Sequence, residues 1–139
     1  MAMPERLAFP RRIPFAETLG LELWRFGAGH AELAIELAPA LHNSFGVAHG
    51  GVLMTLLDVA MARAATSHPD APTRAVVTVE MSTRFVRPGR GPLRAEGLVL
   101  HLAASLCTTE AHVFDASGAR VASAMGTFKF WRAPRRGID

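Results

Sequence analysis

At 139 residues the chain is long enough for one compact domain and too short for two ordinary ones. Half of its residues are hydrophobic and only 19% are charged, a composition that predicts a packed core and excludes a disordered chain. The net charge is only +3, and the arginines are scattered without a basic stripe interleaved with aromatic residues, which argues against nucleic-acid binding.

Neither a membrane span nor a secretory signal is expected. The longest nearly apolar stretch, Val47 to Ala65, contains a histidine, an aspartate and an arginine, whereas a transmembrane helix needs about 20 mostly apolar residues. The segment from Met1 to Arg12 carries charges and lacks the apolar region of a signal peptide. The single cysteine, Cys107, cannot form an internal disulfide, so we expect a cytoplasmic protein without membrane association.

A β-hairpin is expected over Leu21 to Leu37. Leucine, isoleucine and alanine alternate with glutamate in this range, and Gly27 and Gly29 lie between its two halves. Alternation with a period of two indicates strands that bury one face.

A loop over Ala38 to Ala48, rich in proline, asparagine, serine and glycine, leads into a long helix. The helix is expected from Gly50 to about Thr66, and the sequence His68-Pro69-Asp70 ends it. Its hydrophobic residues leave no polar face, and a helix that is apolar nearly all round is normally buried on all sides.

The second half of the chain reads as strands, with a turn at Asp115 to Gly118. The expected strands are Ala75 to Val86, Leu93 to Leu106, Thr108 to Phe114 and Arg120 to Trp131. A hairpin, one buried helix and a meander of three or four strands favour an α+β fold, in which a curved antiparallel sheet of five or six strands wraps one long central helix. We expect one domain over residues 1–139, with its core at about 14–131 and a short, flexible, basic tail at 132–139.

Asp58 is the clearest candidate for a functional residue, because it lies midway along the apolar helix between Leu57 and Val59. An ionised carboxylate that is buried without a partner costs many kcal/mol, so such a group is either paired or functional. One interpretation is a structural aspartate paired with Arg63 or Arg74. The other is a catalytic carboxylate.

The sequence His49-Gly50-Gly51 lies where the loop becomes the helix. The first N–H groups of a helix have no intrahelical partner and lie at the positive end of its dipole, so they can stabilise an oxyanion. Asn43, in the preceding loop, has an amide that can donate to a carbonyl or hold a water. Taken singly, the glycines also fit a plain turn, and Asn43 also fits a loop-forming residue.

Together these residues resemble a family signature. The patterns Asn43-x-x-Gly46-x-x-His49-Gly50-Gly51 and Asp58-x-Ala60-x-x-x-Ala64 are similar to the signature of hot-dog acyl-CoA thioesterases, in the PaaI-type branch typified by phenylacetate degradation. Three further segments agree: Phe15-x-x-x-Leu19-Gly20, Thr78-Val79-Glu80-Met81 and Phe85-Val86-Arg87-Pro88. The resemblance spans about residues 14 to 131 and implies a hot-dog fold that hydrolyses acyl-CoA thioesters to free acid and CoA.

The resemblance also implies roles for single residues. Asn43 orients the thioester or the attacking water, and the N–H of Gly50 polarises the carbonyl. Asp58 acts as general base or as nucleophile, and Thr78 assists as a hydroxyl near the carboxylate. His49 shapes the loop by hydrogen bonding and does not act as the base.

Candidates for substrate binding are Gly51, Arg87 and Arg90. The two arginines flank Pro88-Gly89 and are placed to meet CoA phosphates, although solvated loop charges are the simpler interpretation. No cofactor is implied. A zinc site is not expected either, because His42 and His49 lack a third ligand within reach.

The spacing of Gly50 and Asp58 predicts an assembly. Eight residues of helix separate them, which is about 12 Å along the axis. Groups that act on one carbonyl carbon must approach it to within roughly 3–3.5 Å, so one chain cannot assemble the site. Two central helices that run antiparallel across a dimer would bring Gly50 of one chain to Asp58 of the other. The resemblance implies the same homodimer with shared sites, often paired further into a homotetramer.

Two other functions stay open at this point. A hot-dog acyl-CoA hydratase or dehydratase needs a histidine as a principal acid or base, which the spacing of His49 and Asp58 does not fit well. A non-catalytic acyl-CoA binding or sensing protein is an alternative on the same fold, although the presence of Asn43, Gly50 and Asp58 together argues against it. The acyl group, aryl-acetyl or medium-chain fatty acyl, is not readable.

Overall fold

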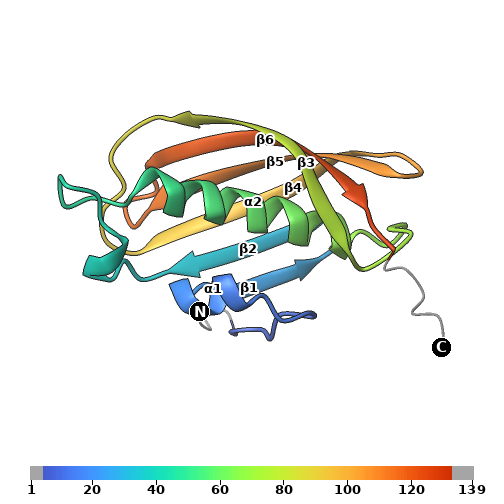
Figure 1. Cartoon of the computed structure of the whole chain (residues 1–139), viewed down its shortest axis with the longest axis horizontal. Coiled ribbons are helices and arrows are strands. Elements are labelled where there is room, and N and C mark those ends of the chain that lie inside the picture. The colour runs from blue at the N-terminus through green and yellow to red at the C-terminus, as the bar shows by residue number, and fades with distance from the viewer. Residues whose placement is uncertain (1–4, 133–139) are drawn as a thin grey trace, which may run out of the picture.

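The computed structural model describes residues 5–132, in which one long helix lies against a six-stranded antiparallel sheet (Figure 1). The strands are β1 (Glu22–Gly27), β2 (His30–Ile35), β3 (Val76–Phe85), β4 (Leu93–Leu102), β5 (Leu106–Asp115) and β6 (Arg120–Phe130). The helices are α1 (Pro14–Leu19), α2 (Gly50–Ser67) and the 3-10 turn η1 (Pro39–Leu41). The predicted hot-dog architecture is confirmed.

The predicted hairpin is formed by β1 and β2, which pair antiparallel. Leu23 and Leu33 face each other across it with fully buried side chains. Ala28 and Gly29 connect the strands with φ angles of 52° and 79°, the left-handed values that a tight two-residue hairpin turn requires. Every second side chain of the hairpin therefore packs into the core beneath α2.

The strand order in the sheet is β1-β2-β4-β5-β6-β3. The predicted meander is present in β4, β5 and β6, whereas β3 lies at the far edge and pairs with β6. After β2, near one edge of the sheet, the chain passes through α2 and re-enters the sheet as β3 at the opposite edge. The sheet curves around the helix (Figure 1). Among residues 5–132, no strand covers the outer edge of β3.

The clearest departures from the prediction are the end of one strand and one short helix. The strand predicted over Leu93 to Leu106 ends at Leu102, and a turn at residues 103–105 precedes β5; the turn is closed by the Ala103 N–H, which donates to the Leu106 carbonyl at 2.8 Å. This turn contains neither glycine nor proline, so it carries no local sequence signal. The short helix α1 was not predicted, although Pro14 begins it and Gly20 ends it with a φ of 78°. Apart from Arg132, the predicted basic tail lies outside the described residues.

The central helix α2 is buried on most of its circumference but not on all sides, so the prediction of complete burial is wrong for a single chain. Gly51, Met54 and Asp58 follow one another at helical spacing and form a solvent-facing strip, in which the Met54 side chain is 39% exposed. None of the helices within the described range combines the length and hydropathy that a bilayer crossing requires.

Helix α2 and β4 approach most closely at Gly97. A Cβ at this position would overlap the backbone carbonyl of Ala60 in α2. We expect Gly97→Ala to lower the free energy of unfolding by about 1–3 kcal/mol or more, as over-packed cores do, because a helix backbone cannot yield locally. Urea denaturation at fixed protein concentration measures this loss.

Gly27→Ala is the matched control, because no heavy atom lies within 4 Å of the Cβ that it adds. Its free energy of unfolding should stay near that of the wild type. Equal stability of the two variants would show that the close approach of α2 to β4 relaxes without cost.

Candidate active site

The first turn of α2 presents one unoccupied backbone donor. His49 caps the helix, and its Nδ1 accepts the N–H of Gly51 at 2.9 Å. The N–H of Val52 donates to the His49 carbonyl at 2.9 Å. No acceptor within residues 5–132 takes the N–H of Gly50. This N–H therefore lies at the positive end of the helix dipole and is available to an oxyanion.

The capping bond defines the role of His49 more closely than the sequence did. Because Nδ1 accepts a hydrogen bond, the neutral ring carries its proton on Nε2. The backbone of His49 is also fixed, since its N–H donates to the Leu41 carbonyl at 2.9 Å. The imidazole thus caps the helix, and the backbone of His49 holds the end of the loop. The same bond occupies the N–H of Gly51, so this N–H is not free for a substrate.

Asn43 organises the loop that precedes α2. Its side-chain Oδ1 accepts the N–H groups of Phe45 and Val47, at 2.9 and 3.3 Å, and its own N–H donates to the Val47 carbonyl at 2.7 Å. The side-chain oxygen is therefore occupied by two hydrogen bonds within the loop. They also orient the amide NH₂, which has no acceptor in the described part of the chain and remains a donor.

A cleft of about 490 Å³ brings four of the predicted residues together. Asn43, Gly50, Arg87 and Arg90 all line it, and its remaining walls are largely apolar: Phe45, Val47, Ala48, Leu53, Phe85, Val86, Pro88 and Gly89. The N–H of Ala48 donates to the Gly89 carbonyl at 2.9 Å, which ties the two lining loops to each other. The cleft combines neutral and cationic donors with an apolar wall, an arrangement typical of small-molecule sites.

Asp58 accepts a hydrogen bond from the Thr78 hydroxyl at 2.6 Å, across the seam between α2 and β3. Half-burial of this carboxyl raises its pKa above the ordinary value, while the Thr78 hydrogen bond and the charge of Arg63 act in the opposite direction. Pairing with Arg63 or Arg74, the structural alternative, is wrong: no ion pair to Asp58 forms within residues 5–132. Arg74 instead donates to the Thr66 carbonyl at 2.7 Å.

The predicted residues fall into two separate groups in one chain. Asn43, Gly50, Arg87 and Arg90 share the cleft, whereas Asp58 and Thr78 do not line it. Eight helical residues separate Gly50 from Asp58, about 12 Å along the axis of α2. In a single chain the Gly50 N–H and the Asp58 carboxylate therefore lie too far apart to act on the same atom.

Three residues near these groups were not predicted as candidates. Phe85 covers Gly50, because a Cβ at that glycine would lie 3.5 Å from the phenyl Cε1. Thr83 lies on the same side of β3 as Phe85, two residues earlier. Its buried hydroxyl has no hydrogen-bond partner among the described residues. Arg63, on α2, has a buried Nε that likewise lacks a partner in residues 5–132. Buried polar atoms distinguish Thr83 and Arg63, and proximity to Gly50 distinguishes Phe85; a single sequence reports neither property.

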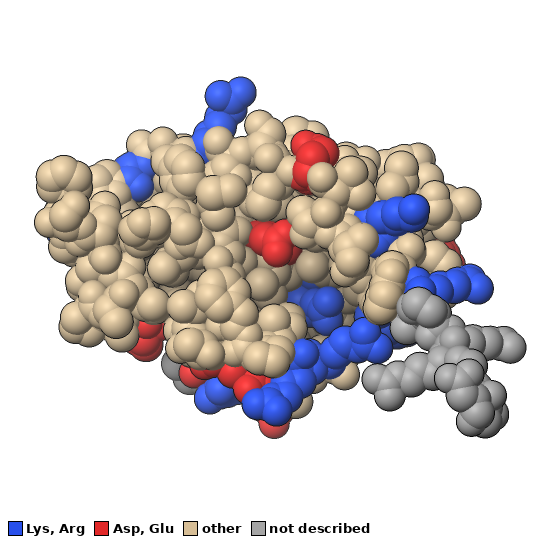
Figure 2. Space-filling model, in the orientation of Figure 1, with Lys and Arg blue, Asp and Glu red and all other residues tan. Residues whose placement is uncertain are grey.

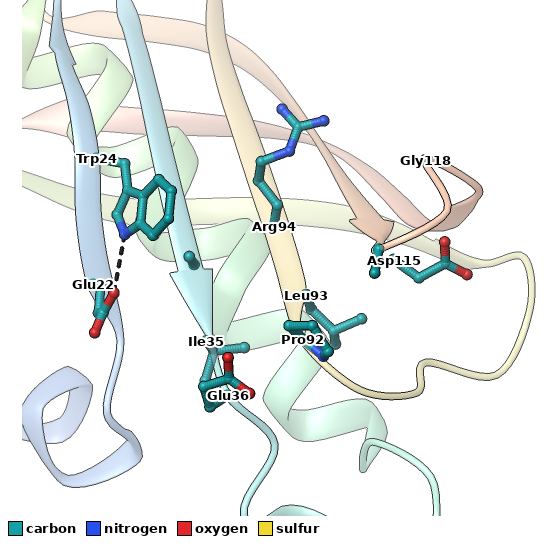
Figure 3. A pocket seen from close by; sticks show the side chains of 11 residues that line it. Glu22, Trp24, Ile35, Glu36, Pro92, Leu93, Arg94, Asp115 and Gly118 are labelled. Carbon is teal, nitrogen blue, oxygen red and sulfur yellow. Dashed lines mark hydrogen bonds between the residues drawn. The ribbon is translucent and has the colours of Figure 1, made fainter. Parts of the chain in front are cut away.

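Another hollow, of about 310 Å³, lies at the ends of β2 and β4 (Figure 3). Trp24 and Arg94 border it, and the Trp24 indole N–H donates to Glu22 at 3.0 Å. None of the predicted site residues lines this hollow, and its carboxylates and single guanidinium do not form a nucleophile with an adjacent base. The residues predicted for catalysis and binding therefore lie away from this hollow.

Comparison with known proteins points to one family. The family model described as Thioesterase superfamily matches residues 45–122. The chain is 26% identical over 135 residues to the medium/long-chain acyl-CoA thioesterase YigI of Escherichia coli K12, covering 86% of this chain and 87% of YigI.

Two solved structures show the same similarity in three dimensions. A conserved protein from Pseudomonas aeruginosa superposes with a TM-score of 0.79 at 33% identity, covering 85% of this chain and 94% of that protein. A mutant of the phenylacetic acid degradation protein PaaI from Thermus thermophilus superposes with a TM-score of 0.77 at 29% identity, covering 86% of this chain and all of that protein.

Proposed function

This chain belongs to the thioesterase superfamily, and we propose that it hydrolyses acyl-CoA thioesters to a free acid and CoA. Family membership gives a hydrolase that acts on a small-molecule thioester. The observation that carries the finer proposal is the unoccupied N–H of Gly50 at the start of α2, on the wall of an apolar cleft. A thioester carbonyl placed there receives a donor directed at the oxygen that becomes negative on attack.

In the proposed mechanism, Asn43 and Gly50 donate to the thioester oxygen or position the water, and Asp58 supplies the electron pair. As a general base, Asp58 takes a proton from water while the water oxygen attacks the carbonyl carbon. As a nucleophile, it attacks the carbon itself and forms an anhydride that water then cleaves. In both routes the C–S bond breaks, CoA leaves as a thiolate, and the carboxylate must start ionised. Thr78 fixes its orientation.

The position of Arg87 and Arg90 supports binding of the CoA phosphates. Both are exposed at the cleft that Gly50 also lines, and neither forms an ion pair within residues 5–132. Guanidinium groups in this state are available to phosphate oxygens. The apolar wall that includes Phe45 and Phe85 then suits the acyl group.

We further propose that two chains share each site. The edge strand β3 carries exposed hydrophobic side chains, including Val77 at 45% and Val79 at 56% exposure, and an open edge of this kind is a template for pairing with another strand. Figure 2 shows that most of the face in front of α2 is uncharged, with one acidic group near its middle and the other charged side chains toward its margins. A two-fold axis beside β3 would set the α2 helices antiparallel and bring Gly50 of one chain to Asp58 of its partner.

An acyl-CoA assay tests the proposed function. Phenylacetyl-CoA and medium-chain acyl-CoAs are incubated with the protein, and free CoA is followed with a thiol-reactive dye. We expect CoA release with kcat/KM of at least about 10⁴ M⁻¹s⁻¹ for the preferred acyl group, the lower end of the usual enzyme range. The ratio of kcat/KM between the two classes identifies the acyl preference.

The same assay separates the alternatives. Tight binding of acyl-CoA without CoA release would indicate a binding or sensing protein, and addition of water to an enoyl-CoA without release would indicate a hydratase. The hydrogen bond from Gly51 to Nδ1 of His49 argues against a hydratase, because it removes one ring nitrogen from acid–base chemistry. Either outcome, with no thioester cleaved, would overturn the proposed function.

A further inference from the structure

Ser123 on β6 and His112 on β5 form a hydrogen-bonded pair on the outer face of the sheet. The two residues lie opposite each other across the strands, and the Ser123 Oγ lies 2.8 Å from Nδ1 of His112. Their neighbours along both strands are buried core residues, so Ser123 and His112 point away from α2. The sheet therefore separates this pair from Gly50 and Asp58 on the helix.

A carboxylate from β5 completes the arrangement. Glu110 Oε2 lies 3.8 Å from Nε2 of His112. Because an ionised carboxylate only accepts hydrogen bonds, the neutral ring carries its proton on Nε2, and Nδ1 accepts the Ser123 hydroxyl. Burial and the nearby Arg120 lower the pKa of His112, against the opposite effects of Glu110 and Glu96. The ring is therefore mostly neutral at neutral pH, the state in which it can take a proton from a serine.

A surface hollow of about 270 Å³ opens beside the pair. Glu110, His112 and Ser123 line it together with Ser82 and Arg84 of the edge strand β3. Arg84 is the cross-strand partner of Ser123, a position at which Cβ atoms lie about 4.5–5.5 Å apart. Its side chain is exposed and forms no ion pair within residues 5–132. A guanidinium beside the serine hydroxyl is thus available to the oxygen of a bound carbonyl.

We propose that Ser123, His112 and Glu110 form a second nucleophilic site, which cleaves carboxylic esters of small acyl groups. His112 takes the Ser123 proton while the hydroxyl oxygen attacks the ester carbonyl, and Arg84 donates to the oxygen that becomes negative. The ester C–O bond breaks, the alcohol leaves with the proton from His112, and the acyl group stays on Ser123. Water then attacks the acyl-serine, and His112 passes a proton of this water to Ser123 as the acid is released. Glu110 stabilises the imidazolium that forms in both steps.

The arrangement has the contacts of a serine hydrolase without its usual sequence. Ser123 lies within a strand, between Ala122 and Ala124, and the G-x-S-x-G motif is absent from the chain. Catalytic triads recur on unrelated folds, however, and are recognised by the geometry and roles of their members. The hollow lies at the lower limit of pockets that take drug-sized ligands, so the substrate is a small ester.

The test uses the full chain carrying Asp58→Asn, which removes the carboxylate proposed for thioester hydrolysis. A fluorophosphonate, which loses fluoride when an activated serine attacks its phosphorus, is applied and its position is mapped by peptide mass spectrometry. We expect label on Ser123 and none on Ser82, which lines the same hollow without a hydrogen bond to a histidine in residues 5–132. In His112→Gln the rate of labelling should fall by about 10²–10⁴-fold, the range for loss of a general base.

Hydrolysis of p-nitrophenyl acetate gives a second readout. The rate in Asp58→Asn chains should fall to that of buffer when Ser123→Ala is added. Ser105→Ala, in the exposed turn before β5, should leave the rate unchanged. Mapping of the label on Ser123 needs no substitution in the sheet, so it does not depend on the folding of a variant.

Three results would overturn the inference: no label on Ser123 under conditions that label chymotrypsin, an equal rate of labelling in His112→Gln, or ester hydrolysis that persists in Ser123→Ala. Neither measurement uses an acyl-CoA. The outcome is therefore independent of the proposed thioester hydrolysis.

Discussion

Replacement of Asp58 by asparagine is expected to lower kcat by about 10²–10⁴-fold, the range for loss of a positioned general base. Asparagine keeps the shape of the side chain and still accepts the hydrogen bond that Thr78 donates to Asp58. It cannot take a proton from water or attack a carbonyl. The loss should therefore appear in kcat with little change in KM, measured by steady-state release of CoA.

Asp70→Asn is the matched control, because Asp70 is exposed just beyond the end of α2 and forms no ion pair within the described residues. It should retain wild-type turnover. Wild-type turnover in Asp58→Asn as well would remove Asp58 from the mechanism.

The same substitution has an expected effect on stability, with a definite pH dependence. Burial raises the pKa of Asp58 in the folded chain above its value in the unfolded chain. The unfolded chain therefore binds fewer protons at intermediate pH, and stability falls as pH rises from the unfolded pKa through the folded one. Asp58→Asn should thus be at least as stable as the wild type at neutral pH, and its advantage should vanish below the ordinary pKa of an aspartate. Urea denaturation at several pH values measures the difference, and a wild type that is clearly more stable at neutral pH would contradict it.

The parts of the fold that local sequence determines were predictable. Alternation in the first hairpin, and the start of α2 after His49, depend on neighbours in the chain, and the structure places both where they were expected. The edge position of β3 depends on which strand it pairs with after a long connection, and local pattern does not encode that choice. The turn at residues 103–105 consists of two alanines and a serine, without the glycine or proline that would mark a turn.

The candidate site shows the same division. Sequence alone indicates Asp58, because a carboxylate between leucine and valine contradicts an otherwise apolar helix. It does not indicate that the Thr78 hydroxyl donates to Asp58, since this contact follows from the packing of β3 against α2. The way Asn43 is held was also hidden: its side-chain oxygen accepts two backbone N–H groups of the loop, and its NH₂ group has no acceptor within residues 5–132.

The proposed division of the site between two chains leads to the second large expected effect. Asp58→Asn chains and Gly50→Val chains should each be inactive alone, and mixing them should restore activity. At Gly50 a Cβ already lies 3.5 Å from the Phe85 ring, so the branched side chain of valine crowds the N–H and the ring. A mixed dimer has one site with both defects and one with neither. Random exchange of equal amounts makes about half of the dimers mixed, so roughly a quarter of the wild-type activity is expected from two-fold symmetry.

The structure provides a control for this experiment within the carboxylate half. Asp58 and Thr78 of one chain are joined by a 2.6 Å hydrogen bond, so the proposed arrangement puts them in the same half of a shared site. Mixing Asp58→Asn with Thr78→Val therefore leaves one defect in every site, and the mixture should not exceed the mean activity of its two parents. Differently tagged chains allow the mixed dimers to be isolated, with about half of the wild-type activity expected for the Asp58→Asn and Gly50→Val pair. Isolated mixed dimers that stay inactive would show that the two halves do not meet across an interface, and the antiparallel arrangement of the α2 helices would have to be abandoned.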